Sequence, residues 1–255
     1  MSVKMLRKQL LAAIAMTIVA IIAVTGSTFA WFATNTRVSA SQMSVTATSA
    51  DPFLHIKRST DADTEYTTVL TFNSTDDPDV TLTDLKLVAP TTIGATPTWY
   101  TALSGNPDQA VDALSATTQT TVTDGDSEYM IKKGLTIKNS STVNAENLEA
   151  SATITIGTGT NIKMNAAARV LIVTETGAYA LFNSDGTLIT SAPATASNAI
   201  LTTTLTAGST LGINVYVYFD GTDTTAKNTT GLGTDPVTVD LKFTIKGDPD
   251  NSTTV

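Results

Sequence analysis

The sequence predicts an all-β protein, a jelly-roll-like β-sandwich preceded by an apolar N-terminal helix. Apolar and polar residues alternate with a period of two in several segments, which is typical of strands with one buried face. About a fifth of the residues are Thr, a β-branched type that favours a pleated sheet surface. Turn signals rich in Asp, Asn and Gly separate these segments, and the spacing of βαβ units is missing from the sequence.

The first thirty residues have the organisation of an export signal. Lys4, Arg7 and Lys8 precede an apolar run at residues 10–24, and small residues follow that run. This order is typical of a secretory signal peptide, and we expect cleavage between Ala30 and Trp31. Alternatively, residues 10–32 stay uncleaved as a membrane helix or as a helix in a filament core, because a bilayer requires about 20 apolar residues. Both interpretations export the rest of the chain across the cytoplasmic membrane, to the cell surface or the extracellular space.

The chain is expected to have four parts. These are a signal peptide or membrane helix at 1–30, an extended segment with the first strand at 31–50, a β-sandwich domain at 51–247 and a frayed polar tail at 248–255. The hydrophobic fraction of 42% is large enough to fill a core. Loss of the first thirty residues removes three of the 15 basic residues and none of the 23 acidic ones, so the exported part carries a net charge of -11.

The alternation predicts the strands in order along the exported part. Early strands are expected at 43–48, 53–57, 66–72, 80–88 and 129–137. Later strands are expected at 148–156, 169–174, 179–182, 188–189 and, more weakly, 200–205, with a turn at 183–186. The run at 169–174 is continuously apolar, which predicts a strand covered on both faces. Residues 108–114 favour a short helix.

Two late segments alternate most clearly. At 237–245 five apolar residues share one face, which predicts a central core strand: Val237, Val239, Leu241, Phe243 and Ile245. At 211–219 the apolar face carries Ile213, Val215, Val217 and Phe219, whereas Tyr216 and Tyr218 belong to the opposite face.

The composition excludes several kinds of chemistry. The chain has no Cys, which rules out disulfides and a thiolate nucleophile. Its one histidine, His55, cannot form a multi-histidine metal site, and neither a metalloprotease helix motif nor a Gly-x-Ser-x-Gly motif is present. The acidic balance argues against nucleic acid as a partner. We therefore expect no enzyme activity, no catalytic or metal-binding residues and no cofactor.

Calcium is the one ion that stays open as an alternative, because Ca²⁺ prefers oxygen-rich loops. Acidic residues cluster in four loops: Asp61/Asp63/Glu65, Asp76/Asp77/Asp79, Asp124/Asp126/Glu128 and Asp220/Asp223. Their spacing does not match the twelve-residue EF-hand loop, so solvated turns are the preferred interpretation.

Other polar and aromatic residues have ordinary explanations beside functional ones. His55 alternates with Leu54 and Ile56 and is expected to point away from the core. Four asparagines head Asn-x-Ser/Thr triplets, which matter only in a glycosylating pathway: Asn73, Asn139, Asn228 and Asn251. Four aromatic residues offer either a sugar-binding platform or packing between strands: Trp99, Tyr100, Tyr216 and Tyr218.

Two patches of sequence resemble a known group of exported proteins. Residues 26–32, Gly-Ser-Thr-Phe-Ala-Trp-Phe, and the following 35–45 resemble the signal-peptide end and first strand of the TasA/camelysin group of Gram-positive bacteria, whose signal is cut by a dedicated signal peptidase. Residues 215–223 are similar to a late strand and acidic turn of the same proteins. The resemblance covers about forty residues and implies a jelly-roll fold and a matrix fibre or surface layer joined by donated strands. Some members are described as metalloproteases, but this sequence lacks the histidines for that chemistry.

The sequence therefore predicts an extracellular structural protein that self-associates into a surface or biofilm-matrix fibre by β-strand donation. The expected donor segment contains Trp31, Phe32, Thr34, Thr36 and Val38, whose later members alternate and favour an extended backbone. One alternative is a pilin-like or membrane-anchored subunit that keeps its N-terminal helix and contacts the membrane only through residues 10–32. Another is a secreted adhesin or glycan-binding β-sandwich.

Overall fold

The computed structural model describes residues 43–49, 53–72, 85–101, 120–156, 166–192, 199–223 and 237–245. The chain divides into two compact units, Met1–Arg37 and Val38–Val255, and all described residues belong to the second. In the described part, all fourteen named elements are β-strands, which confirms the all-β class. The helices expected at 10–32 and 108–114 lie outside the described residues.

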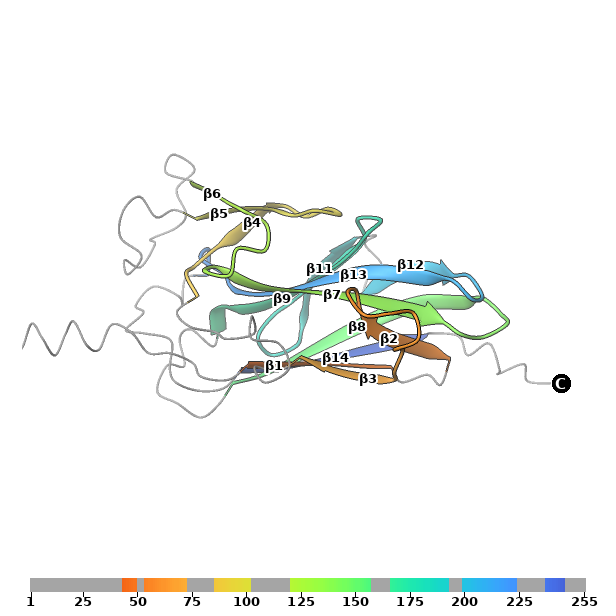
Figure 1. Ribbon diagram of the computed structural model, residues 1–255. Coiled ribbons are helices and arrows are strands. Elements are labelled where there is room, and N and C mark those ends of the chain that lie inside the picture. The colour runs from red at the N-terminus through yellow and green to blue at the C-terminus, as the bar shows by residue number, and fades with distance from the viewer. Residues whose placement is uncertain are drawn as a thin grey trace, which may run out of the picture. The chain divides into compact units, whose positions relative to one another are not determined.

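The strands form three sheets (Figure 1). In chain order they are β1 (Met43–Ser49), β2 (Leu54–Arg58), β3 (Val69–Phe72), β4 (Ala89–Thr92), β5 (Thr98–Thr101), β6 (Thr120–Val122), β7 (Met130–Asn139), β8 (Ala145–Ile156), β9 (Ala168–Thr174), β10 (Tyr179–Phe182), β11 (Leu188–Ala192), β12 (Ile200–Leu205), β13 (Thr210–Phe219) and β14 (Val237–Ile245). A five-stranded sheet has the order β12-β8-β14-β1-β3, and a six-stranded sheet has the order β11-β10-β9-β13-β7-β2. The third sheet has the order β4-β5-β6.

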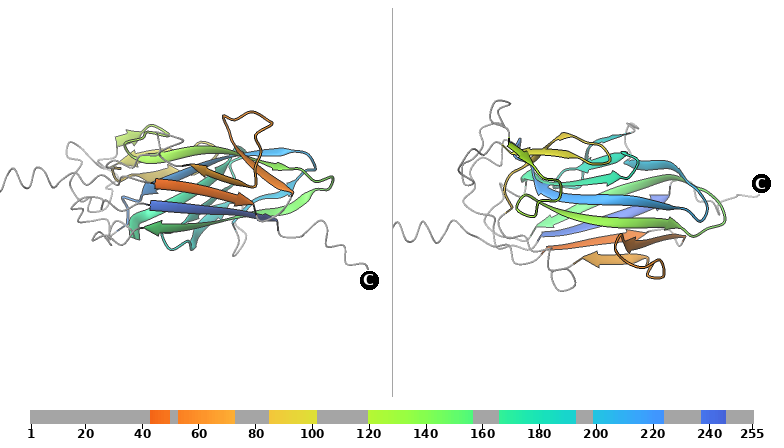
Figure 2. Two further views of the ribbon diagram at one scale, coloured as in Figure 1. Left: turned by 60° about the horizontal axis from the view of Figure 1, so that its bottom comes forward. Right: turned by 45° about the horizontal axis from the view of Figure 1, so that its top comes forward.

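The five-stranded sheet joins the first and last described strands. β14 is its central strand and pairs with β8 in the antiparallel sense and with β1 in the parallel sense, so that β1 and β14 run side by side (Figure 2). The parallel register runs from Met43 opposite Val237 to Ser49 opposite Phe243. β3 then pairs with the other side of β1 and forms one edge of the sheet. β14 is therefore a central core strand, as its alternation predicted.

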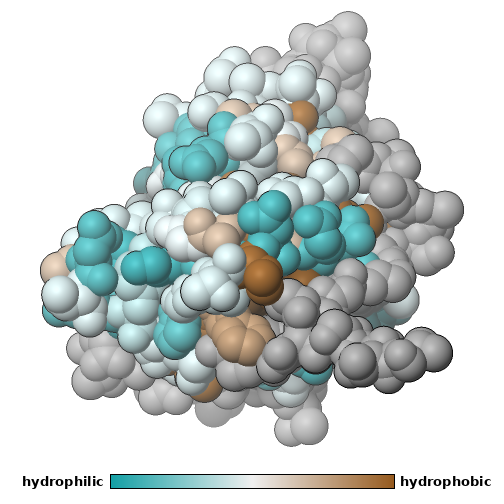
Figure 3. Space-filling view, turned by 90° about the vertical axis from the view of Figure 1, so that its right-hand side faces the viewer, coloured by the Kyte–Doolittle hydropathy of each residue, from teal (hydrophilic) through white to brown (hydrophobic). Residues whose placement is uncertain are grey.

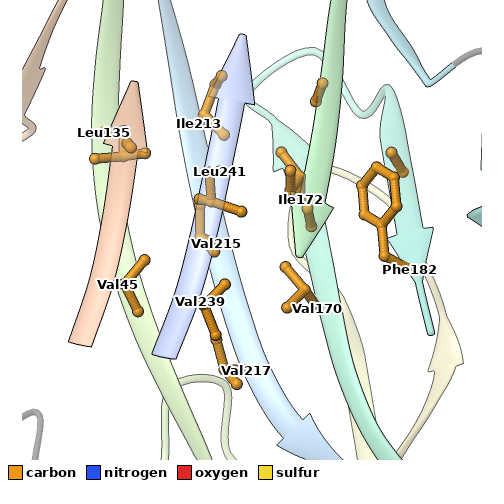
Figure 4. Packing of buried hydrophobic residues seen from close by; sticks show 14 of the residues in the cluster. Val45, Leu135, Val170, Ile172, Phe182, Ile213, Val215, Val217, Val239 and Leu241 are labelled. Atoms are coloured by element: carbon orange, nitrogen blue, oxygen red, sulfur yellow. The ribbon is translucent and has the colours of Figure 1, made fainter. Parts of the chain in front are cut away.

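One hydrophobic core fills the space between the two large sheets. Val239 and Leu241 of β14 lie across from Val215 and Val217 of β13 (Figure 4). The alternating faces are those that the sequence predicts, because an alternating strand can bury only one of its two faces against a single layer. At about 1.5–3 kcal/mol for each fully buried side chain, this core is the main stabilising contribution to the domain.

The small β4-β5-β6 sheet covers part of the other face of the six-stranded sheet. Trp99 of β5 packs in a second core with Leu171 and Val173 of β9 and with Tyr216 and Tyr218 of β13. All seven residues of β9 are buried, which confirms that this strand is covered on both faces. The six-stranded sheet is therefore the middle layer where the small sheet covers it.

The small sheet is where the strand predictions were wrong. Of the strand predicted at 80–88, residues 80–84 lie outside the described part of the chain. Residues 85–87 are not in a strand, Val88 makes an isolated bridge with Asp220, and β4 begins at Ala89. β5 and β6 were not predicted, because their short sequences, Thr-Trp-Tyr-Thr and Thr-Thr-Val, contain few apolar residues and no recognisable alternation. In contrast, the predicted turn at 183–186 is confirmed: Gly186 N donates to Asn183 O (2.9 Å), and Gly186 has a φ of +82°, which glycine adopts without steric cost.

Candidate functional site

Several residues with a predicted role lie outside the described part of the chain. These are the cleavage pair Ala30 and Trp31, the donor residues Phe32, Thr34, Thr36 and Val38, the acidic loop Asp76/Asp77/Asp79, and Asn73, Asn228 and Asn251. The candidate residues that the structure does describe all belong to the β-domain that follows the proposed donor segment.

In the acidic loop at 124–128, the carboxylate of Asp124 contacts neighbouring strands of the domain. Asp124 accepts hydrogen bonds from Trp99 Nε1 (3.1 Å) and from Lys132 Nζ (2.6 Å), and Tyr216 OH lies 3.4 Å away. These contacts connect the small sheet, β7 and β13 through one side chain. Asp124 is thus a structural hydrogen-bond acceptor, and Lys132 balances its charge.

The turn at 220–223 is held by a buried arginine. Arg169 of β9 donates from Nη2 to Asp223 Oδ2 (2.5 Å), and its Nε lies 3.5 Å from Asp220 Oδ2. Nη1 of the same side chain donates to Asn183 Oδ1 (2.8 Å) and to two backbone carbonyls. Arg169 therefore fastens the ends of three segments, β9, β13 and the β10–β11 turn. The sequence contained a signal for this role, because Arg169 is the one charged residue in an apolar run and a buried charge needs partners.

The third described acidic loop also forms local contacts. Asp61 Oδ2 accepts from Arg58 N (3.1 Å), Asp63 pairs with Lys57 (3.0 Å), and Glu65 Oε2 accepts from Ala62 N (3.1 Å). Within the described residues, Asp, Glu and His side chains do not gather in a group of three or more that could hold a metal ion. The carboxylates of this loop therefore make contacts within their own turn and with the neighbouring strand β2.

His55 lies where the alternation places it, on the face of β2 opposite the buried Leu54 and Ile56. Its Nδ1 is 2.8 Å from Ser140 Oγ. Asn139 is fully buried, and its amide donates to the carbonyls of Val143 and Leu205 (2.9 Å each). Asn139 is therefore a structural residue and is inaccessible as a glycosylation acceptor in the folded domain.

The aromatic residues do not form an exposed platform. Trp99, Tyr216 and Tyr218 are buried, and the Trp99 ring lies 5.3 Å from that of Tyr216 and 5.0 Å from that of Tyr218. Of the two interpretations of these residues, packing between strands is the one that the structure shows for Trp99, Tyr216 and Tyr218, because the small sheet covers this face of β13. These residues therefore give no support to a glycan-binding function.

Burial also changes the chemistry of the two tyrosines. Removal from water is the largest effect that raises the pKa of Tyr216 and of Tyr218, and the carboxylates Asp124 and Asp220 add to it. The fold therefore favours the neutral phenols. Among the described residues, the hydroxyl of Tyr218 has no hydrogen-bond partner, although Tyr218 is only 1% exposed.

Replacing Tyr218 by Phe is expected to leave stability at neutral pH unchanged or to increase it, because the substitution removes a buried hydroxyl that lacks a partner. Above pH ~10, the ordinary pKa of tyrosine, the unfolded chain ionises while the folded chain holds the proton, so stability falls as the pH rises. The Phe variant should show a smaller fall. Urea unfolding at pH 8 and at pH 11 measures both effects, and a loss of more than ~1 kcal/mol at pH 8 would contradict the assignment.

The lateral edges of the two large sheets can also bind a partner, because edge strands carry backbone N–H and C=O groups that are not paired within the sheet. β3 and β12 form the edges of the five-stranded sheet, and β2 and β11 form those of the six-stranded sheet. The end of the domain seen in Figure 3 shows mostly residues of intermediate hydropathy together with several hydrophilic ones, and a few hydrophobic residues among them. The sheet edges are therefore the described surfaces best suited to bind another β-segment.

Comparison with known proteins yields no match: no protein-family model, curated protein or solved structure is significantly similar to this chain. Among the residues described above, no helix has the length and apolar character needed to cross a membrane.

Proposed function

We propose that this chain is an exported, non-enzymatic subunit of a surface or biofilm-matrix fibre. In this proposal the domain is a β-sandwich of jelly-roll type, and the subunits assemble by β-strand donation. Residues 31–38 of one copy, with Trp31 and Phe32 at the tip, would pair with an open sheet edge of the next copy. The resemblance of the signal exit to the TasA/camelysin group points to the same assembly.

The observation that carries the proposal is the position of β1. This strand lies inside the five-stranded sheet and is paired on both sides, with β14 and with β3. Residues 31–42 come directly before β1 in the sequence, so a segment donated from them would be attached to a strand that is fixed within the sheet of its own domain.

The polar contacts of the domain suit a rigid building block. Asp124 and Arg169 each connect three segments that are distant in sequence, and both act through hydrogen bonds within the domain. A fibre subunit needs such rigidity, because every junction transmits load through the folded domain.

Deleting residues 31–36 from the exported protein is expected to give a folded monomer that no longer polymerises. The deletion removes both aromatic residues at the tip and two of the three alternating residues, Thr34 and Thr36, while the domain keeps all its described strands. Light scattering follows assembly, and a thermal melt verifies the fold. The variant should also cap fibres of the intact protein, because it keeps an acceptor edge.

Fibre formation by the deletion variant at the normal rate would exclude residues 31–36 as the donor. Electron microscopy of the secreted protein tests for fibres directly. Its intact mass tests the start of the chain: strand donation predicts a first residue of Trp31, whereas a mass that includes the first thirty residues would indicate an anchored subunit.

A further inference from the structure

Hydrogen bonds cover the outer edge of β2. Ile56 N donates to Thr67 O (2.6 Å), and Thr67 N donates to Ile56 O (2.8 Å). Further along the strand, Arg58 N donates to the carboxylate of Asp61 (3.1 Å). A strand added beside β2 would have to break these bonds, so this edge is closed.

The outer edge of β3 is covered by side chains. The hydroxyl of Thr67 donates to Val69 O (3.0 Å) and accepts from Val69 N (3.3 Å). Arg58 Nη2 donates to Thr71 O (3.2 Å) and brings a positive charge to the same edge. Hydrogen bonds to the edge backbone and a nearby charge both prevent the pairing of a further strand. We therefore call the β2/β3 side of the domain guarded.

The two edge strands on the opposite side of the domain, β11 and β12, carry no charged residues. The sequence from 186 to 219, which contains β11, β12 and β13, has no Asp, Glu, Lys, Arg or His. On β12, the hydroxyl of Thr202 donates to Thr204 O (3.0 Å) and accepts from Thr204 N (3.4 Å), so this edge is partly covered.

Judged by the described residues alone, β11 is the least guarded of the four edges. Among the described residues, β10 is the only segment to which the backbone of β11 is hydrogen-bonded. The pairing with β10 skips Ile189, which marks a bulge, the kind of irregularity that weakens edge pairing, and Ile189 is 49% exposed. Thr190, the next residue, is also exposed. An uncharged, half-paired strand with an exposed aliphatic side chain is a template for another strand.

We propose that β11 is the acceptor edge, and that its occupant is the segment 31–42 of a second copy of this chain. The inference rests on the proposed function and specifies the surface that receives the donated strand. Segment 31–42 contains a single charged residue, Arg37, and thus resembles the acceptor edge in its lack of charge. Twelve extended residues span about 40 Å, more than twice the ~17 Å of a five-residue strand such as β11, so the segment can reach along the edge and still connect to its own β1.

Two matched substitutions test the assignment. Ile189→Lys places a charge on the proposed acceptor edge, and Val69→Lys places the same charge on the guarded β3 edge, where Val69 is 53% exposed. In the exported protein, Ile189→Lys is expected to slow fibre growth by about tenfold or more, because the added strand would cover the new charge. Val69→Lys should assemble like the unmodified protein. Thermal melts verify the fold, and Thr190→Lys is the second variant if Ile189→Lys is unfolded.

A mixing experiment separates donor from acceptor. The protein without residues 31–36 keeps the acceptor edge, and Ile189→Lys keeps the donor segment. Each variant alone should be monomeric, whereas a mixture should give a two-chain complex and no fibres, as measured by size-exclusion chromatography with light scattering.

The outcomes distinguish the two proposals. If the unmodified protein forms no fibres, both the proposed function and the acceptor edge are wrong. If the deletion stops assembly but Ile189→Lys and Thr190→Lys assemble at the normal rate, strand donation stands and β11 is not the acceptor. If Val69→Lys stops assembly instead, the acceptor is on the β3 side, which also overturns the assignment.

Discussion

Replacing Leu241 by Asp is expected to abolish the cooperative thermal unfolding of the domain. Leu241 is 1% exposed, belongs to the central strand β14, and lies in the core between the two large sheets (Figure 4). Its neighbours across the adjacent strands are Ala47 and Ala152, which offer no partner for a carboxylate. Burying an unpaired charge costs several kcal/mol, a large part of the 5–15 kcal/mol that stabilises a typical domain. Circular dichroism during heating measures the transition.

Lys242→Asp is the matched control, because Lys242 is the next residue of β14 and its side chain is exposed. A surface charge change away from special contacts alters stability by about 0.5 kcal/mol or less, so the melting temperature should move little. Similar melting of the two variants would contradict the facing of β14.

Replacing Arg169 by Met is expected to lower the free energy of unfolding by about 3–5 kcal/mol, the usual cost of removing one partner from a buried ion pair. The substitution preserves much of the side-chain volume but leaves Asp220 and Asp223, whose side chains are 18% and 17% exposed, without their cation. It also removes the donor to Asn183. Urea unfolding at neutral pH measures the loss.

Two controls separate this effect from a general loss of charge. Lys86→Met removes the cation of the more exposed Lys86–Glu128 pair and should cost about 1 kcal/mol or less. Adding Asp220→Asn and Asp223→Asn to Arg169→Met should recover part of the loss, because the uncompensated carboxylates are then neutral. Equal losses for the Arg169 and Lys86 variants would show that the buried network does not stabilise the fold.

Local patterns were sufficient to predict most of the strands. The alternation at 237–245 predicted β14 and its buried face, and Val239, Leu241 and Phe243 are buried. The run at 169–174, which is apolar from Val170 to Val173, predicted a strand covered on both faces, which β9 is. These predictions succeed because the buried positions of a strand are occupied by apolar residues, so their spacing can be recognised in the local sequence.

The roles of individual polar residues were less predictable. Tyr216 and Tyr218 alternate with apolar residues as surface residues would, yet both are buried under the small sheet. Asp124 and Asp223 occur in turns, where an acidic residue is usual, and their partners are distant in sequence. The identity of a contact between distant segments is not contained in a local pattern.

The sequence by itself determined the all-β class, the position of the long strands and the face that each buries. These features follow from the alternation of apolar and polar residues, which is visible in any short stretch of a strand. Only the tertiary structure decided that β1 pairs in parallel with β14, that β4, β5 and β6 cover the middle sheet, and that Arg169 joins Asp220 and Asp223. It also decided which edges are guarded, since the cover of β3 comes from Thr67 and Arg58 rather than from β3 itself. Strand pairing and edge protection depend on residues that meet only when the chain folds, and for this reason they could not be predicted from period or composition.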